Sequence, residues 1–276
     1  MPGIDAHQHF WKFDAKRDQW ITDEMSLIRR DFLPGDLQSL LASNGLEGCV
    51  TIQSDQSEAE NIFQLANAER HDFIRGVVGW TDLQAEDISE KLDYFSRFKK
   101  LKGFRHILQG EIKRDLMLQP DFLRGIAALQ KHRYTYDILI YPDQLRFIAP
   151  FVSRFPQQKF VIDHMAKPHI RSQTIDEWKH DIGTVAAYEN VSCKISGFVT
   201  EADVKHWSGE DFTPYFDAVV ELFGFDRIIF GSDWPVCLLG GSYDEITRVV
   251  TNYFAAFSQD ERDKFFGKNA VDFYNL

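Results

Sequence analysis

Short apolar runs alternate with amphipathic segments along the whole chain. The apolar runs are rich in β-branched and aromatic residues and end in polar residues, a pattern typical of buried strands. They lie at residues 3–9, 49–54, 74–80, 101–107, 135–141, 159–164, 191–196 and 227–233. The sequence therefore predicts eight strands, most of which carry polar groups at the carboxyl end.

The segments between these strands have the periodicity of amphipathic helices. The predicted helices cover residues 34–44, 57–71, 85–98, 120–132, 143–155, 175–189, 212–223 and 243–257, and a short helix follows near 259–266. Asn44 and Gly45 are typical of a helix end, and Ser258 is a suitable N-cap for the short helix. Because strands and helices alternate without a linker, we expect an α/β fold, a (β/α)8 TIM barrel that forms a single domain over residues 1–276.

Charge and composition exclude several classes of partner. The chain has 31 Lys and Arg against 42 Asp and Glu, a net charge of −11, and no basic run. We therefore expect no nucleic-acid partner and no anionic membrane surface. The sequence shows no apolar leader and no membrane-spanning run, and its three cysteines lack C-x-x-C spacing. These features favour a cytoplasmic protein with buried free thiols.

The polar residues at the strand ends are the candidates for chemistry, because TIM barrels place their active sites at this end. His7 and His9 share one face of the first strand, and two imidazoles on one face can hold a metal ion. Two polar residues on a solvated edge strand are the alternative for an isolated H-x-H pair. Further polar groups end the other strands: Gln53, Trp80, Arg105, Tyr141, Asp163, His164, Lys194 and Asp233.

Three motifs at these ends carry a family resemblance. They are the H-x-H pair, the stretch from Asp163 and His164 to Pro168, and Gly231-Ser232-Asp233-Trp234-Pro235. Together they resemble the amidohydrolase superfamily, and within it the branch of sugar-lactone and 2-pyrone-4,6-dicarboxylate lactonases. The resemblance spans essentially the whole chain, and hydrolases of L-fuconolactone and L-rhamnonolactone look most similar.

The resemblance implies roles for four residues. His7, His9, His164 and Asp233 would hold one divalent metal, with zinc as the first expectation. Asp233 would be the general base, and His164 would either complete the metal shell or donate to the substrate carbonyl. A second metal is not expected, because the fourth and fifth strands lack the further ligands of binuclear relatives. Some relatives work without a metal, and His7, His9, His164 and Arg105 would then polarise the carbonyl as donors.

Other strand-end residues are predicted to bind substrate. The resemblance places Arg105 and Tyr141 at substrate oxygens. Gln53 is a further candidate at a strand end. Trp80 and Trp234 are either packing residues or walls of a sugar site. Lys194 would meet substrate or a neighbouring carboxylate.

Side-chain alternation predicts the orientation of three more residues. By parity, His106 and Asp163 should face the helices. Asp5 should face inward below His7 and His9. The long loop at residues 10–34 is either solvated surface or a lid over the barrel mouth.

These observations predict a hydrolase that opens a small-molecule sugar lactone by attack of water on the carbonyl. Two alternatives remain at this point. One is a decarboxylase of the same superfamily, and the other is a non-catalytic barrel that binds a carbohydrate acid or a protein partner.

Overall fold

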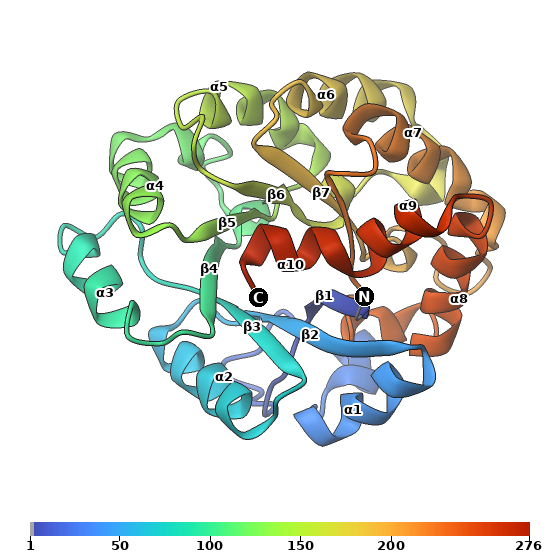
Figure 1. Cartoon of the computed structure of the whole chain (residues 1–276), viewed down its shortest axis with the longest axis horizontal. Helices are drawn as coiled ribbons and strands as arrows, with labels where there is room; N and C mark the ends of the chain where they lie inside the picture. Colours follow the sequence, from blue (N-terminus) through green and yellow to red (C-terminus); the bar gives the residue numbers. More distant parts are fainter. Residues whose placement is uncertain (1–2) are drawn as a thin grey trace.

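The computed structural model describes residues 3–276, and its centre is one sheet of eight parallel strands in the order β1 to β8 (Figure 1). The strands are β1 (Gly3–Gln8), β2 (Leu46–Ile52), β3 (Ile74–Gly79), β4 (Leu101–His106), β5 (Thr135–Ile138), β6 (Phe160–Ile162), β7 (Val191–Ile195) and β8 (Ile228–Phe230). The sheet curls until its ends meet: His9 N donates to Trp234 O and Asp233 N donates to His7 O, both at 2.7 Å. The predicted TIM barrel is confirmed.

Helices surround this barrel. They are α1 (Pro34–Ser43), α2 (Glu58–Arg70), α3 (Ile88–Phe95), α4 (Pro120–His132), α5 (Ile148–Val152), α6 (Asp176–Ala186), α7 (Thr213–Phe223), α8 (Tyr243–Phe254) and α9 (Gln259–Asp263). Ser258 caps α9 as predicted, by accepting a hydrogen bond from Glu261 N. Gly45, just after α1, has a φ of +71°, a left-handed conformation that glycine adopts without strain.

Short helical turns lie in the connections. They are η1 (Asp23–Ile28), η2 (Leu108–Gly110), η3 (Leu116–Leu118), η4 (Pro142–Phe147), η5 (Asp163–Ala166), η6 (Ile170–Ser172), η7 (Val199–Glu201), η8 (Gly209–Asp211), η9 (Val236–Leu239) and a π-helical turn η10 (Lys264–Lys268). The three cysteines are buried free thiols, as expected. Between residues 3 and 276, no helix combines the length and the apolar character that a membrane span requires.

A bulge in β1 changes which side chains face the barrel interior. Asp5 pairs with Cys49 but Gln8 pairs with Thr51, so β1 has one residue more than β2 across this interval. Ile4 and Ala6 consequently pack inside the barrel with Val50. Asp5 faces the outer layer, where Tyr243 of α8 donates to its carboxylate. The predicted shared face of Asp5 with His7 and His9 was therefore wrong, because simple alternation fails at a bulge.

A final helix, α10 (Asn269–Tyr274), was not predicted. It crosses the amino-terminal mouth of the barrel, next to the first strand (Figure 1). Its residues Ala270, Phe273 and Tyr274 pack into the same interior cluster as Ile4 and Val50. The carboxyl-terminal mouth, where β1, β6 and β8 end, holds the candidate active site.

Candidate active site

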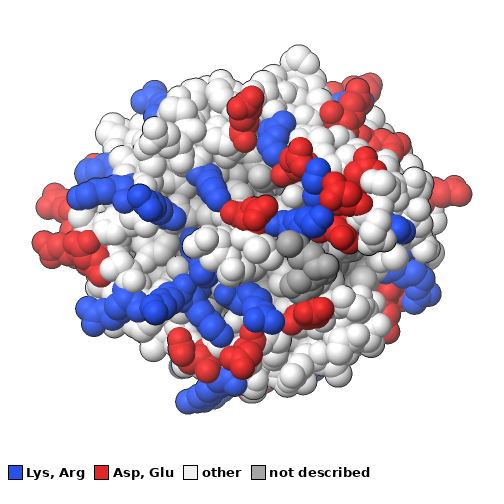
Figure 2. Space-filling model, in the orientation of Figure 1, with Lys and Arg blue, Asp and Glu red and all other residues white. Residues whose placement is uncertain are grey.

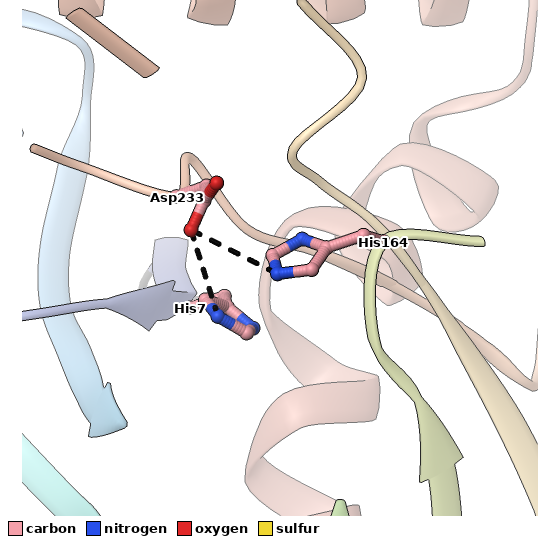
Figure 3. Close-up of side chains that lie close together, drawn as sticks. All are labelled: His7, His164 and Asp233. Carbon is pink, nitrogen blue, oxygen red and sulfur yellow. Dashed lines mark ion pairs between the residues drawn. The ribbon is translucent and has the colours of Figure 1, made fainter. Parts of the chain in front are cut away.

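Three imidazoles converge on one carboxylate oxygen at the carboxyl-terminal mouth. The Nε2 atoms of His7, His9 and His164 lie 3.7, 3.3 and 3.8 Å from Asp233 Oδ1. Figure 3 shows His7, His164 and Asp233 pointing toward one another from the ends of three different strands. All four side chains are buried. The structure thus brings together the four residues predicted as metal ligands.

Two of these side chains, those of His164 and Asp233, are positioned by unusual backbone conformations. Asp233 has a φ of +60°, and residues His164 to Lys167 form a left-handed turn with φ between +52° and +58°. Each such residue costs about 1–2 kcal/mol relative to the right-handed region. This cost indicates that the surrounding packing, rather than local preference, holds the site in place.

Two glycines allow the side chains of the site to pack closely. A Cβ atom on Gly197 would lie 2.4 Å from His164 Nδ1, and a Cβ atom on Gly231 would lie 2.4 Å from His7 Cβ. Gly197 also has a φ of +59°. Any larger residue at either position would displace an imidazole of the site.

The hydrogen bond of His9 fixes the tautomer of that side chain. Its Nδ1 lies 2.8 Å from the carbonyl oxygen of Ile52, which can only accept, so Nδ1 carries a proton. In neutral His9, Nε2 then presents a lone pair to Asp233 Oδ1 at 3.3 Å. Two acceptors at this distance need a cation between them, either a proton on Nε2 or a metal ion.

The protonation states of the other groups suit a metal ligand set. Burial lowers the pKa values of His7 and His164 well below the ordinary histidine value, so both imidazoles are neutral near pH 7. Burial alone would raise the pKa of Asp233, but its interactions with the neighbouring His164 and His9 outweigh burial, so the pKa of Asp233 lies below the ordinary aspartate value. One ligand atom each from His7, His164 and Asp233 lies within 4.8 Å of the others. Two imidazole nitrogens and a carboxylate oxygen match the donors that zinc prefers.

Arg105 borders this ligand group. Its Nη1 atom lies 3.3 Å from His7 Nε2 and donates to Asp163 Oδ2 at 3.0 Å. Gln53 accepts from Arg105 Nη2 at 2.9 Å through its side chain and also through its backbone carbonyl. Arg105 reaches the cavity surface, whereas Gln53 acts as its support.

Lys194 is fully buried below the site and does not reach the cavity. Its Nζ lies 2.6 Å from Asp137 Oδ2, 2.9 Å from Asp163 Oδ1 and 3.3 Å from His7 Nδ1. Of its predicted partners, the neighbouring carboxylate is therefore the one that the structure provides. The prediction that Asp163 faces the helices was wrong: it points into the barrel and contacts Lys194, Arg105 and His7. Asp163 directly follows β6 and continues its alternation from Val161, which faces the interior. The prediction counted parity from His164, which belongs to the left-handed turn.

A cavity of about 190 Å³ opens above the four residues. Its walls include residues that the sequence analysis did not select: Trp20, Ser54, Ile107, Gln109, Leu139, Lys167 and Val236. Most of them come from loops after the strands, and no periodic pattern marks such positions. Trp20 belongs to the loop at residues 10–34, whose two ends are joined by the antiparallel pairing of Trp11 with Phe32.

Besides Gln53 and Lys194, three further predicted substrate-binding residues lie outside this cavity lining. Trp234 is 1% exposed and packs its indole ring against Phe10 and Phe32. Trp80 donates from its indole nitrogen to His106 Nδ1 at 3.2 Å. Tyr141 is 40% exposed and lies at the rim, where Lys167 Nζ is 5.5 Å from the centre of its ring.

Comparison with known proteins identifies the family of this chain. A family model described as Amidohydrolase matches residues 4–276. The chain belongs to the amidohydrolase family. This confirms the resemblance that the strand-end motifs had carried.

Similar proteins cover between two thirds and the whole of this amidohydrolase. An L-fucono-1,5-lactonase of Burkholderia multivorans is 37% identical over 284 residues, which are 99% of this chain and 96% of the relative. An L-rhamnono-gamma-lactonase of Scheffersomyces stipitis is 28% identical over 206 residues, 66% of this chain and 61% of the relative. A crystal structure of an amidohydrolase from Burkholderia multivorans with bound zinc superposes with a TM-score of 0.97 at 37% identity, and the match covers 100% of both chains.

Proposed function

We propose that this amidohydrolase opens the lactone ring of a sugar acid, with L-fucono-1,5-lactone as the first candidate substrate. The observation that carries the proposal is the ionised carboxylate of Asp233, surrounded by three imidazoles at the floor of a small cavity. Full-length similarity to an L-fucono-1,5-lactonase supports this choice of substrate. The cavity volume of about 190 Å³ suits a small molecule rather than a polymer.

Asp233 acts as the general base. The lowered pKa of Asp233 keeps it ionised at neutral pH, so it can accept a proton from the water that attacks the lactone carbonyl. The same carboxyl group then returns the proton to the ring oxygen as the carbon–oxygen bond breaks, which yields the open aldonate. Because Asp233 carries a proton only between these two steps, it ends the reaction in the form in which it started.

Arg105 stabilises the negative charge that develops on the carbonyl oxygen. Arg105 is suited to this role because Gln53 and Asp163 hold its guanidinium group at the cavity wall before substrate enters. His7, His9, His164 and Asp233 would hold a divalent metal, for which we propose zinc. When bound, this metal would supply Lewis acidity to the carbonyl or to water.

The walls of the cavity position the sugar. Lys167 and Gln109 present polar groups that can bind hydroxyls, and Trp20 presents an indole that is 41% exposed. An aromatic face of this kind stacks on the apolar face of a sugar ring. We propose that these residues, rather than Trp80 and Trp234, distinguish one lactone from another.

A panel of aldonolactones tests the proposal. The purified protein is assayed with L-fucono-, L-rhamnono- and D-galactonolactones of both ring sizes, by acid release in a pH-indicator assay and by NMR of the product. We expect acid release well above the spontaneous rate for at least one L-sugar lactone, without carbon dioxide. Release of carbon dioxide from an aromatic acid would instead identify a decarboxylase, and no turnover of either class would identify a binding protein. Elemental analysis of the same sample tests the assignment of zinc.

A further inference from the structure

We propose that Tyr274, at the opposite mouth of the barrel from the cavity, is a positioning residue for His7. The inference rests on the proposed lactone hydrolysis, because it assigns Tyr274 a part in that reaction. The hydroxyl group of Tyr274 holds Asp137, and Asp137 holds Lys194 against Asp163 and His7. The carboxyl-terminal helix α10 is therefore part of the support of the active site.

A continuous series of polar contacts runs along the barrel axis. Tyr274 donates from its hydroxyl group to Asp137 Oδ2 at 2.7 Å. Lys194 Nζ donates to the same oxygen at 2.6 Å and lies 2.9 Å from Asp163 Oδ1. His7 Nδ1 lies 3.2 Å from Asp163 Oδ1 and 3.3 Å from Lys194 Nζ. Each step is within contact distance, so a shift of one group acts on the next.

Burial makes this series sensitive to the loss of one donor. Asp137, Asp163, Lys194 and His7 are all 0% exposed. Within residues 3–276, Asp137 Oδ1 has no hydrogen-bond partner, so both donors to this carboxylate, Tyr274 and Lys194, meet at Oδ2. Burial raises the pKa of Asp137 to about 6 in spite of the neighbouring Lys194. Without the tyrosine hydroxyl, Lys194 would be the single partner of Asp137 and would be drawn away from Asp163.

The helix that carries Tyr274 is anchored at its carbonyl end. Lys102 Nζ donates to Asn275 O and Lys159 Nζ donates to Asp272 O, both at 2.7 Å. Positive groups at the carboxyl end of a helix also interact favourably with its dipole. Figure 2 shows the face that α10 crosses, where Lys and Arg side chains gather on the side of α3 and α4. The rings of Phe273 and Tyr274 both belong to the interior cluster of the barrel.

The substitution Tyr274→Phe removes the hydroxyl group and keeps the ring. We expect kcat to fall about 10–100-fold, the usual effect of removing a group that orients a functional histidine. We expect KM to change less than about twofold, because Tyr274 and its partners do not line the cavity. The ¹⁵N resonance of His7 Nδ1 should also shift, since this atom lies between Lys194 and Asp163.

Two control variants separate this role from stability. Tyr253→Phe removes a hydroxyl that donates to Asp217 Oδ1, also at 2.7 Å, in the outer helical layer. Phe273→Leu weakens the packing of α10 without touching the hydrogen bond. Both controls should lower the melting temperature without lowering kcat or moving the His7 resonance.

The outcomes decide between the roles. A selective loss of kcat and a shifted His7 resonance in Tyr274→Phe alone support the positioning role. Wild-type kcat and an unmoved resonance in Tyr274→Phe, or an equal loss in Phe273→Leu, overturn it. If the wild-type protein opens no lactone, the proposed function fails, and the His7 resonance by itself still tests the contact series.

Discussion

The substitution Asp233→Asn removes the proposed base while leaving its backbone in place. Asparagine adopts the left-handed region more readily than other residues with a side chain, so it tolerates the φ of +60° at this position. The backbone hydrogen bonds from Asp233 N to His7 O and from Cys237 N to Asp233 O do not involve the side chain. We therefore expect the free energy of unfolding to change by less than about 1 kcal/mol.

The expected effect on turnover follows from the contacts of Asp233 Oδ1. An asparagine amide cannot accept a proton at neutral pH, and the loss of a general base lowers kcat by about 10²–10⁴-fold. The amide also binds a cation more weakly than the carboxylate on which three imidazoles converge. We expect a decrease in kcat of at least about 10³-fold, which corresponds to about 4 kcal/mol in the activation free energy.

Acid release from L-fucono-1,5-lactone in weakly buffered indicator measures this effect, after subtraction of spontaneous hydrolysis. Asp217→Asn is the matched control, because Asp217 belongs to α7 in the outer layer and contacts Tyr253 there. The control should keep the wild-type rate. Retention of more than about a tenth of wild-type kcat by a folded Asp233→Asn protein would refute the assignment of the base.

Three further predictions concern the neighbours of this group. Gly197→Ala should lower kcat at least about tenfold and the free energy of unfolding by about 1–2 kcal/mol, because the alanine Cβ would lie 2.4 Å from His164 Nδ1 and position 197 has a left-handed φ. Kinetics and thermal denaturation test this prediction, and wild-type values would contradict it. Trp20→Ala should raise KM several-fold with kcat nearly unchanged, since the indole forms part of the cavity wall away from Asp233; a selective loss of kcat would show another role. Because the pKa values of Asp233, His7 and His164 are lowered, protonation of these groups should not reduce kcat/KM between about pH 7 and about pH 5. A decrease in kcat/KM with a midpoint near pH 6.5, the ordinary pKa of histidine, would count against these shifts.

The sequence predicts the site best where chain position alone determines geometry. His7 and Arg105 lie at the carboxyl ends of β1 and β4, and Asp233 lies shortly after β8. The carboxyl ends of parallel strands in a closed barrel face one mouth. Alternation within one strand was sufficient to place His7 and His9 on the same side. For these residues, their order along the chain was enough to predict where the side chains lie.

Prediction failed where the backbone departs from regular alternation. The bulge in β1 turns Asp5 outward, and the left-handed turn after β6 breaks the parity between Asp163 and His164. Neither departure has a sequence signal such as a glycine at the irregular position. One extra residue reverses the orientation of every later side chain in a strand. An error of this kind therefore assigns a charged side chain to the helical layer when it points to the barrel axis.

A second group of residues could not be found from periodicity. Trp20 and Gln109 lie in loops, whose course depends on packing across the whole mouth. Tyr274 belongs to α10, a helix too short to show a clear amphipathic period, and its partner Asp137 is 137 residues away in sequence. Contacts over such distances follow from the closed barrel and not from any local pattern.

A crystal structure with an unreactive lactam analogue of L-fucono-1,5-lactone tests the central claim most directly. The account predicts that the lactam carbonyl lies in the cavity above His7, His9 and His164, next to Arg105, with Asp233 on the side from which water attacks. An analogue bound elsewhere, or one whose carbonyl points away from Asp233, would contradict it.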